Sequence, residues 1–328
     1  MSTFRTEVEI QKQTDRISHQ SEILMLGSCF TENIGLRLKE LKFNVNLNPF
    51  GIIFNPTSVG NSLKRIISGN KFTERELFFF NEAWHSYMHH SNFSAVNKET
   101  CLDQINKRLQ EANAHIRKTE YLILTFGTAW VFFHKANNIV VSNCHKVPAS
   151  HFTQQILSVS EIAENFKSII TELKTINPNL KIIFTLSPVR HLKDGAEGNQ
   201  VSKAILRLAI HELCSLNMGT YFPAYEIMLD DLRDYRFYNT DMVHPSEQAT
   251  DYIFEKFASL YFSSETLKLN AEIKSIQTAS KHRPFSLEST SHKTFAKNIL
   301  HKIELIEKKY GHIDFCSEKL LLGNCLKY

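Results

Sequence analysis

The best indication of the fold class is the segment Ile23-Leu24-Met25-Leu26-Gly27-Ser28-Cys29-Phe30-Thr31-Glu32-Asn33-Ile34-Gly35, in which an expected strand is followed by an expected helix. Residues 23–26 are uninterruptedly apolar, which predicts a buried strand of a parallel sheet, because helices cover both faces of such strands. Residues 31–42 then predict a helix, with Ile34, Leu38 and Leu41 at three-to-four spacing. A buried strand followed at once by a helix indicates an α/β domain.

The same alternation continues to about residue 262. The expected strands cover residues 43–47, 121–125, 181–186 and 221–222, and the expected helices cover 56–67, 100–118, 158–176, 201–216 and 245–262. Residues 72–93 alternate aromatic and polar side chains and are expected to form an extended excursion from the sheet. This order predicts an α/β fold with a mostly parallel sheet, helices on both faces, and functional residues after the carboxyl ends of the strands.

The composition changes after residue 262. Residues 263–328 contain no strand-like run, and Lys, Glu, Ser and His surround apolar positions at helical spacing. Ile299, Ile303 and Ile306 form a stripe that needs a surface to cover it. We therefore expect one domain over residues 1–262 and a helical C-terminal extension over 263–328, with a loosely ordered link at 281–291.

Composition limits the classes of function. The 328 residues carry 38 Lys and Arg against 34 Asp and Glu, so the net charge of +4 offers no basic face to nucleic acid. No GxGxxG or GxxxxGK loop and no metal-ligand spacing is present, so we expect no cofactor and no metal. The six cysteines show no paired spacing, the N-terminus is acidic, and the most apolar stretch, about 13 residues, is too short to span a membrane. We expect a reduced, cytoplasmic protein without a membrane partner.

Two short motifs carry side chains that can do chemistry. Ser28 and Cys29 stand where a strand ends and a helix begins, and backbone N–H groups there favour an anion. Asp241 precedes His244 by three residues, so its carboxylate can orient the imidazole while the imidazole takes a proton from a nucleophile. Each motif alone also fits a structural role, with Ser28 as a helix cap and Cys29 as a small core residue. Together, at opposite ends of one α/β domain, they indicate nucleophilic catalysis.

Both motifs resemble those of known hydrolases. Residues 23–35 and the block Asp241-Met242-Val243-His244-Pro245-Ser246 resemble the opening and closing motifs of the SGNH/GDSL hydrolases. The segments Gly-Ser-Cys-Phe (27–30), Asn-Pro-Phe-Gly (48–51), Cys-His-Lys-Val-Pro (144–148) and Ser-Pro-Val-Arg-His (187–191) resemble, more narrowly, the GSCFA family. The resemblance covers residues 1–262, and the tail is also of that family's type. It implies a three-layer α/β/α sandwich and cleavage of a carboxylic ester or thioester through a covalent acyl-enzyme.

The resemblance leaves the nucleophile open. Laid without gaps, the usual Gly-Asp-Ser becomes Gly27-Ser28-Cys29, which places Cys29 as the nucleophile, whereas a shift of one residue restores Ser28. Cys29 is slightly favoured, because the ungapped match keeps the flanking residues in place and a thiol at a helix N-terminus near an imidazole ionises easily. Under either assignment His244 is the base and then the acid, and Asp241 orients it.

The resemblance also implies an incomplete oxyanion site. Gly51 matches the glycine whose N–H donates to the oxyanion, and the N–H of the nucleophile is a second donor. Where the superfamily has Gly-x-Asn-Asp, residues 127–130 read Gly-Thr-Ala-Trp, so the usual side-chain amide is missing. Asn143 or His145 can replace it, although the polar cluster around them is equally a hairpin turn. Arg190 can bind an anionic group or form a surface ion pair.

Two functions of different classes fit these residues. The first is a hydrolase that cleaves a small-molecule or glycan-linked acyl ester, or an acyltransferase that uses the same site. The second is a non-catalytic descendant that keeps the pocket to bind a carbohydrate or an acyl ligand. The changes at Gly27-Ser28-Cys29 and at Ala129 motivate this alternative.

Overall fold

The computed structural model describes residues 6–11, 13–282 and 289–326, and the chain divides into two compact units. The first unit comprises residues 1–12, 22–36 and 45–257, and the second comprises 13–21, 37–44 and 258–328. Two early segments, residues 13–21 and 37–44, thus group with the C-terminal part, and the expected domain boundary at residue 262 stays a prediction. Most of the expected loose link, residues 283–288, lies outside the described residues.

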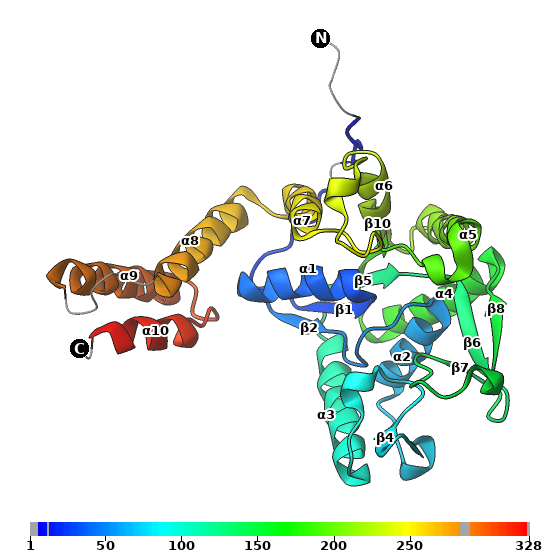
Figure 1. The fold of residues 1–328 in the computed structure, drawn as a ribbon. Helices are drawn as coiled ribbons and strands as arrows, with labels where there is room; N and C mark the ends of the chain where they lie inside the picture. Colours follow the sequence, from blue (N-terminus) through cyan, green and yellow to red (C-terminus); the bar gives the residue numbers. More distant parts are fainter. Residues whose placement is uncertain (1–5, 12, 283–288, 327–328) are drawn as a thin grey trace. The chain divides into compact units, whose positions relative to one another are not determined.

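A five-stranded parallel sheet forms the centre of the first unit (Figure 1). Its strands are β1 (Ile23–Gly27), β2 (Val45–Leu47), β5 (Tyr121–Phe126), β9 (Lys181–Leu186) and β10 (Thr220–Phe222). They lie in the order β10-β9-β5-β1-β2, with Gly27 opposite Thr125 and Thr125 opposite Thr185. The strand order reverses between β1 and β5, and ligands of open parallel sheets bind beyond the strand ends at such a reversal.

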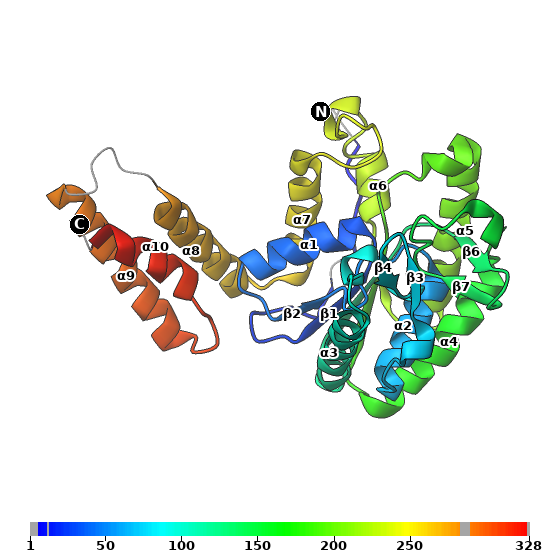
Figure 2. The ribbon, with the colours of Figure 1, turned by 60° about the horizontal axis from the view of Figure 1, so that its bottom comes forward.

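Helices cover both faces of this sheet, as its buried apolar strands require (Figures 1 and 2). One face shares a core with α2 (Pro56–Ser68), α3 (Lys98–Ile116), α4 (Val159–Ile176) and α5 (Gly195–Ser215). The opposite face, which includes Met25, Ile123 and Ile183, is covered by the start of α1 (Cys29–Glu40) and by α7 (Glu247–Tyr261). The fold is a three-layer α/β/α sandwich, which confirms the predicted fold class.

The predicted helices are present, with shifts at their ends. The capping box that opens α4 is formed as predicted: the Ser158 hydroxyl accepts the Glu161 N–H at 3.2 Å, and the Glu161 carboxylate accepts the Ser158 N–H at 2.7 Å. Helix α1 starts at Cys29, two residues before the predicted start, so this thiol lies in its first turn. Among the helices of the described residues, none combines the length and apolarity that a transmembrane segment requires.

Several short elements around the sheet were not predicted individually. An antiparallel sheet has the order β7-β6-β8, with β6 (Trp130–His134), β7 (Ile139–Val141) and β8 (Phe152–Ile156). The predicted excursion contains the hairpin of β3 (Phe78–Phe80) and β4 (Ala83–His85). The remaining helical turns are α6 (Ala224–Leu229), η1 (Glu74–Glu76), η2 (Ser91–Phe93), η3 (Ala149–His151), η4 (Leu192–Asp194) and η5 (Tyr235–Phe237).

Gly27 allows β1 to pass directly into α1. Its φ is 153°, and a Cβ at this position would lie 2.4 Å from the Thr125 carbonyl oxygen and 2.5 Å from Thr31 Oγ1. Both distances are far below van der Waals contact. The residue before the predicted nucleophile pair is therefore restricted to glycine by β5 on one side and α1 on the other.

We predict that Gly27→Ala lowers the free energy of unfolding by about 3 kcal/mol or more, because steric overlap adds to an unfavourable backbone conformation. Gly195→Ala is the matched control, since its φ of 76° also favours glycine but no heavy atom of the described residues lies within 4 Å of its Cβ position. The control should lose only about 1 kcal/mol. Urea unfolding measures both, and equal losses would contradict the role given to the close contacts.

The second unit has its own helical core. Helices α8 (Ser264–Lys281), α9 (Thr290–Lys309) and α10 (Cys316–Leu326) pack together, which confirms the helical C-terminal extension. The stripe of Ile299, Ile303 and Ile306 is buried in this core with Ile273 of α8. The stripe is therefore covered by other residues of the second unit.

Residues 13–21 and 37–44 also belong to the second unit and contact its C-terminal part. The Phe43 ring stacks on His19 at 4.2 Å and on Phe262 at 5.0 Å between ring centroids. Lys42 forms an ion pair with Glu318 at 2.9 Å. Residues far apart in the sequence therefore hold this unit together.

Candidate active site

Of the two candidate nucleophiles, Cys29 is the accessible one. Ser28 is 0% exposed, and its hydroxyl accepts the N–H of Phe30 at 3.3 Å, as in a helix-capping turn. Cys29 is only partly buried and opens α1 next to the point where the strand order reverses. The structure therefore favours the thiol as the group that a substrate can reach.

Burial raises the pKa of the Cys29 thiol above its ordinary value. The N–H groups of Phe30 and Cys29 and the Lys203 ammonium oppose this rise, whereas the Asp241 carboxylate adds to it. The expectation that the helix N-terminus makes this thiol ionise easily is therefore wrong, because the cost of burying the charge is larger. A thiol that stays protonated at neutral pH needs a base.

Asp241 and His244 form a hydrogen-bonded pair in the loop before α7. His244 Nδ1 lies 2.7 Å from Asp241 Oδ2, and Asp241 Oδ1 accepts the N–H groups of Val243 at 2.9 Å and His244 at 3.0 Å. These hydrogen bonds lower the pKa of Asp241 to about 2. The ionised carboxylate holds the proton of the imidazole on Nδ1, which makes Nε2 the proton acceptor. The side chains of His244 and Asp241 are 43% and 49% exposed, so solvent reaches the pair.

Electrostatic interactions link this pair to the nucleophile. Burial, together with the charges of Lys203 and His244, lowers the pKa of His191 to about 4, so this imidazole is neutral. Cys29 in turn interacts with both Lys203 and Asp241. We call Cys29, His191, Lys203, Asp241 and His244 the edge cluster, because they gather at the carboxyl edge of the parallel sheet.

The loop with Gly51 crosses the point where the strand order reverses. Asn48 Oδ1 accepts the N–H of Gly27 at 3.0 Å, which ties the loop to the end of β1. The Gly51 N–H donates to the Asn48 carbonyl oxygen at 2.8 Å, so this donor is engaged within the turn. The oxyanion role of Gly51 stays a prediction, and it requires this N–H to be shared with the oxyanion or released.

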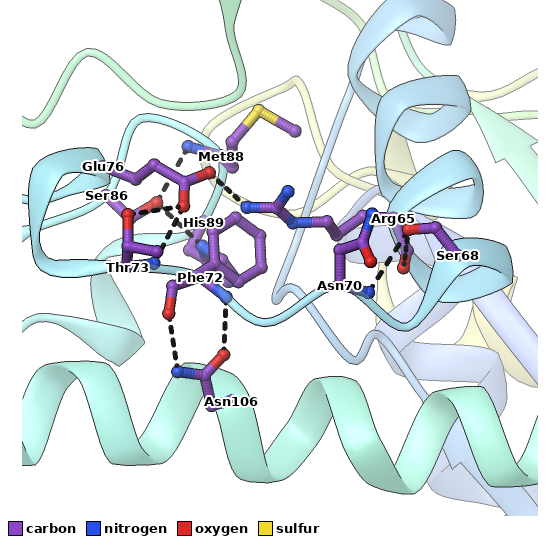
Figure 3. Close-up of polar contacts among 10 residues, drawn as sticks. All are labelled: Arg65, Ser68, Asn70, Phe72, Thr73, Glu76, Ser86, Met88, His89 and Asn106. Carbon is purple, nitrogen blue, oxygen red and sulfur yellow. Dashed lines mark hydrogen bonds and ion pairs between the residues drawn. The ribbon is translucent and has the colours of Figure 1, made fainter.

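Buried aromatic side chains support this loop. The Phe50 ring stacks on His89 at 4.6 Å between ring centroids. His89 also lies 4.8 Å from the Phe72 ring centroid in a T-shaped arrangement and hydrogen bonds with Ser86 Oγ at 2.9 Å (Figure 3). Asn106 holds the backbone of Phe72 with two hydrogen bonds, at 2.8 and 3.0 Å. Burial lowers the pKa of His89 to about 3, so this histidine is neutral and packs as an aromatic ring.

Asn143 and His145 lie in a second histidine-rich group. His145 Nε2 is 2.9 Å from the Ser86 carbonyl oxygen, and its ring centroid is 4.6 Å from that of His85. Asn143 Oδ1 accepts the His145 N–H at 2.8 Å, and the φ of His145 is 48°, so the segment is a tight turn. These contacts are with the segment around β4 and not with the edge cluster. A role for either residue in binding the oxyanion stays a prediction.

Arg190 is linked to the loop with His244 by its backbone and to two tyrosines by its charge. Its backbone N–H donates to the Val243 carbonyl oxygen at 3.1 Å, which joins the loop after β9 to the loop with His244. Burial raises the pKa of Tyr225 and of Tyr238, and the Arg190 guanidinium opposes both rises. Arg190 and the two tyrosines together offer a positive charge and hydroxyl groups that can contact a polar substrate.

Lys203 is the residue of the edge cluster that the sequence analysis did not name. It lies on the buried face of α5 with Leu206, Ala209 and Ile210. Its position in the sequence could have identified it, because Lys203 falls at three-to-four spacing within the apolar stripe of α5. Charged residues are rarely fully buried without a specific partner, so a lysine in such a stripe indicates a special role. His191 ends the segment Ser-Pro-Val-Arg-His (187–191), which indicated no role for it.

The chain matches models of one protein family over most of its length. The model of the GSCFA family matches residues 22–257, and the model of the C-terminal domain of GSCFA domain proteins matches residues 273–328. No curated protein matches the sequence. An acetyl xylan esterase (Est2A) from the rumen bacterium Butyrivibrio proteoclasticus has a similar structure, with a TM-score of 0.36 and 10% identity over 75% of this chain. The chain spans 64% of that esterase's length, and a likeness at this level carries no argument about function.

Proposed function

The chain belongs to the GSCFA family, and we propose that it is an SGNH-type hydrolase that cleaves a carboxylic ester or thioester through an acyl-enzyme on Cys29. The observation that supports this proposal most is the Asp241–His244 pair, 2.7 Å between Oδ2 and Nδ1, in one edge cluster with an accessible cysteine. A nucleophile, a base and an orienting carboxylate are the parts that acyl transfer needs.

In the proposed reaction, His244, Cys29 and Gly51 have separate roles. His244 Nε2 takes the thiol proton as Cys29 Sγ attacks the carbonyl carbon, since burial keeps the thiol protonated beforehand. The N–H of Cys29, and that of Gly51 when it turns from Asn48, donate to the oxyanion. His244 then gives its proton to the leaving alcohol or thiol. Water, activated by the same imidazole, releases the acid and restores the thiol.

We propose a small-molecule or glycan-linked acyl ester as the substrate class. Arg190, beside Tyr225 and Tyr238, offers a cation and aromatic rings to the polar part of such a molecule. Transfer of the acyl group to an acceptor other than water uses the same residues. A cytoplasmic location remains a prediction, and it would keep Cys29 reduced.

Short-chain p-nitrophenyl esters test the proposal. We expect turnover that iodoacetamide abolishes by alkylating Cys29 and that His244→Ala lowers by about four orders of magnitude. Wild-type protein alkylated in the presence of excess ester serves as the control, because substrate should protect the thiol. Absence of turnover, together with alkylation of Cys29 that ignores pH and survives His244→Ala, would favour the binding module instead.

A further inference from the structure

Asn48 stands at the first position of the turn that carries Gly51. The Gly51 N–H closes this turn by donating to the Asn48 carbonyl oxygen at 2.8 Å. Pro49 and Gly51 occupy the second and fourth positions, where four-residue turns favour proline and glycine. The backbone therefore forms the turn without help from the Asn48 side chain.

The buried Asn48 side chain instead joins the turn to residues that are distant in the sequence. Its Oδ1 accepts the Gly27 N–H at 3.0 Å, and its Nδ2 donates to Glu32 Oε2 at 2.6 Å. The backbone N–H of Asn48 donates to the Met25 carbonyl oxygen at 2.8 Å. One residue thus connects the turn to the end of β1 and to the first turn of α1, which flank Cys29 in the sequence.

These contacts require an asparagine at position 48. An amide offers an acceptor to a backbone N–H and a donor to a carboxylate at the same time, whereas aspartate offers acceptors only. Because a carboxylate only accepts, Glu32 fixes the orientation of the amide, with Nδ2 toward α1 and Oδ1 toward Gly27. Asn48 also has a φ of 41°, in the left-handed region that asparagine tolerates better than most residues.

The opposite side of the turn is fixed by the segment that follows β4. The Phe50 carbonyl oxygen accepts the His90 N–H at 2.9 Å, and a Cβ at Gly51 would lie 2.3 Å from His90 Cβ. The turn is therefore held from two sides. Loss of the hydrogen bonds of Asn48 would displace the Gly51 N–H relative to Cys29 without unfolding the turn.

We propose that Asn48 is a positioning residue that, together with Glu32, holds the Gly51 turn beside the start of α1, so that the N–H groups of Gly51 and Cys29 serve one oxyanion. These two N–H groups are the oxyanion donors of the proposed function, on which this inference rests. Asn48 acts through the backbone of Gly51 and needs no contact with the substrate. A displacement of a donor by about 1 Å costs about 100-fold in rate.

Asn48→Asp tests the two side-chain hydrogen bonds. It keeps an acceptor for Gly27 but places a second carboxylate against Glu32, and the two like charges repel. We expect kcat for a p-nitrophenyl ester to fall about 100-fold, with KM changed less than about threefold, because the donors act on the transition state. In the double variant Asn48→Asp/Glu32→Gln, the glutamine amide donates to the aspartate, so kcat should return to within about fivefold of wild type.

Three controls separate the position of the turn from charge and from general damage. Glu32→Gln alone still offers an amide oxygen to Asn48 Nδ2, so kcat should change less than about threefold. Asn46→Asp makes the same substitution on β2, where Oδ1 accepts from Arg108 at 3.0 Å, and should leave kcat unchanged. Alkylation of Cys29 by iodoacetamide builds no oxyanion, so its rate should change less than about threefold in every variant.

Amide hydrogen exchange follows the turn without any substrate. With 15N-labelled glycine, the Gly51 N–H should exchange about tenfold faster in Asn48→Asp than in wild type, and the double variant should restore the wild-type rate. Glu32→Ala provides the test if Asn48→Asp does not fold. It removes the acceptor of Asn48 Nδ2, so exchange at Gly51 should be about tenfold faster and kcat about tenfold lower.

Turnover and exchange together decide the outcome. Equal losses of kcat in Asn48→Asp and the double variant, a parallel loss of Cys29 alkylation, or a Glu32→Ala protein indistinguishable from wild type overturns the inference. Faster exchange at Gly51 that the double variant reverses, without ester turnover by the wild type, leaves the positioning of the turn standing and removes the proposed function. Ester turnover that Asn48→Asp leaves unchanged does the reverse.

Discussion

Cys29→Ala is expected to abolish ester cleavage, with kcat lower by about six orders of magnitude, because the atom that carries the acyl group is gone. Cys29→Ser should retain a weak activity, since an alkoxide needs the base throughout and the site is shaped around sulfur. Ser28→Ala should be much milder. Its hydroxyl is wholly buried and accepts the N–H of Phe30, so its loss costs about 1 kcal/mol of stability and leaves the chemistry in place. Steady-state kinetics with one p-nitrophenyl ester compares the three variants.

The acyl-enzyme itself gives the decisive measurement. Intact-mass analysis after mixing with a slow ester should show one added acyl group, and peptide mapping should place it on Cys29. Hydroxylamine should remove it readily, as expected for a thioester. An adduct on Ser28, or full turnover by Cys29→Ala, would reverse the assignment.

Asp241→Asn is expected to lower kcat by about four orders of magnitude while the fold stays intact. An asparagine amide can donate to His244 Nδ1, which moves the imidazole proton to Nε2 and removes the base. Asp234→Asn is the matched control. This aspartate accepts the N–H of Arg236 at 2.9 Å in a similar turn but orients no histidine, so the rate should change less than about twofold. Activity of Asp241→Asn within about tenfold of wild type would exclude the pair from catalysis.

The pH profile checks the same pair. Hydrogen bonds from His244 and Val243 lower the pKa of Asp241 from 3.8 to about 2, so the stabilisation that its ionised form gives is complete above pH 3.8 and is lost as the pH falls through about 2. An acid limb of the rate between pH 5 and 7 therefore belongs to another group. The profile of kcat/KM between pH 4 and 8 measures this, and a limb in that range that belongs to Asp241 would contradict the lowered pKa.

The local parts of the fold and site could be predicted from the sequence. The strand at Lys181–Leu186 has the predicted ends, because a parallel strand buried on both faces is a continuous apolar run. The Asp241–His244 pair was also predictable, because two residues three positions apart in one loop can form a hydrogen bond without help from distant parts of the chain. Which of Ser28 and Cys29 is accessible could not be predicted, because α1 starts at Cys29, two residues before the predicted start.

The parts that depend on distant residues could not be predicted. Strand β8 is mostly polar and exposed and pairs with β6 across residues 135–151, so no apolar run marks it. Lys203 joins the site only because α5 packs on the sheet beside the ends of β5 and β9. The raised pKa of Cys29 is likewise a result of burial by the whole domain, which a helix N-terminus in the sequence does not reveal.

The division of the chain has a consequence for any exchange of its C-terminal part. The backbone passes from one compact unit to the other at residues 12–13, 21–22, 36–37, 44–45 and 257–258. A segment exchanged by a single recombination event near residue 257 would therefore replace the C-terminal helices but leave behind residues 13–21 and 37–44, which belong to the same unit. The helix that begins at Cys29 also ends inside that unit, at Glu40. An exchange confined to the C-terminal helices would thus separate them from residues of their own unit.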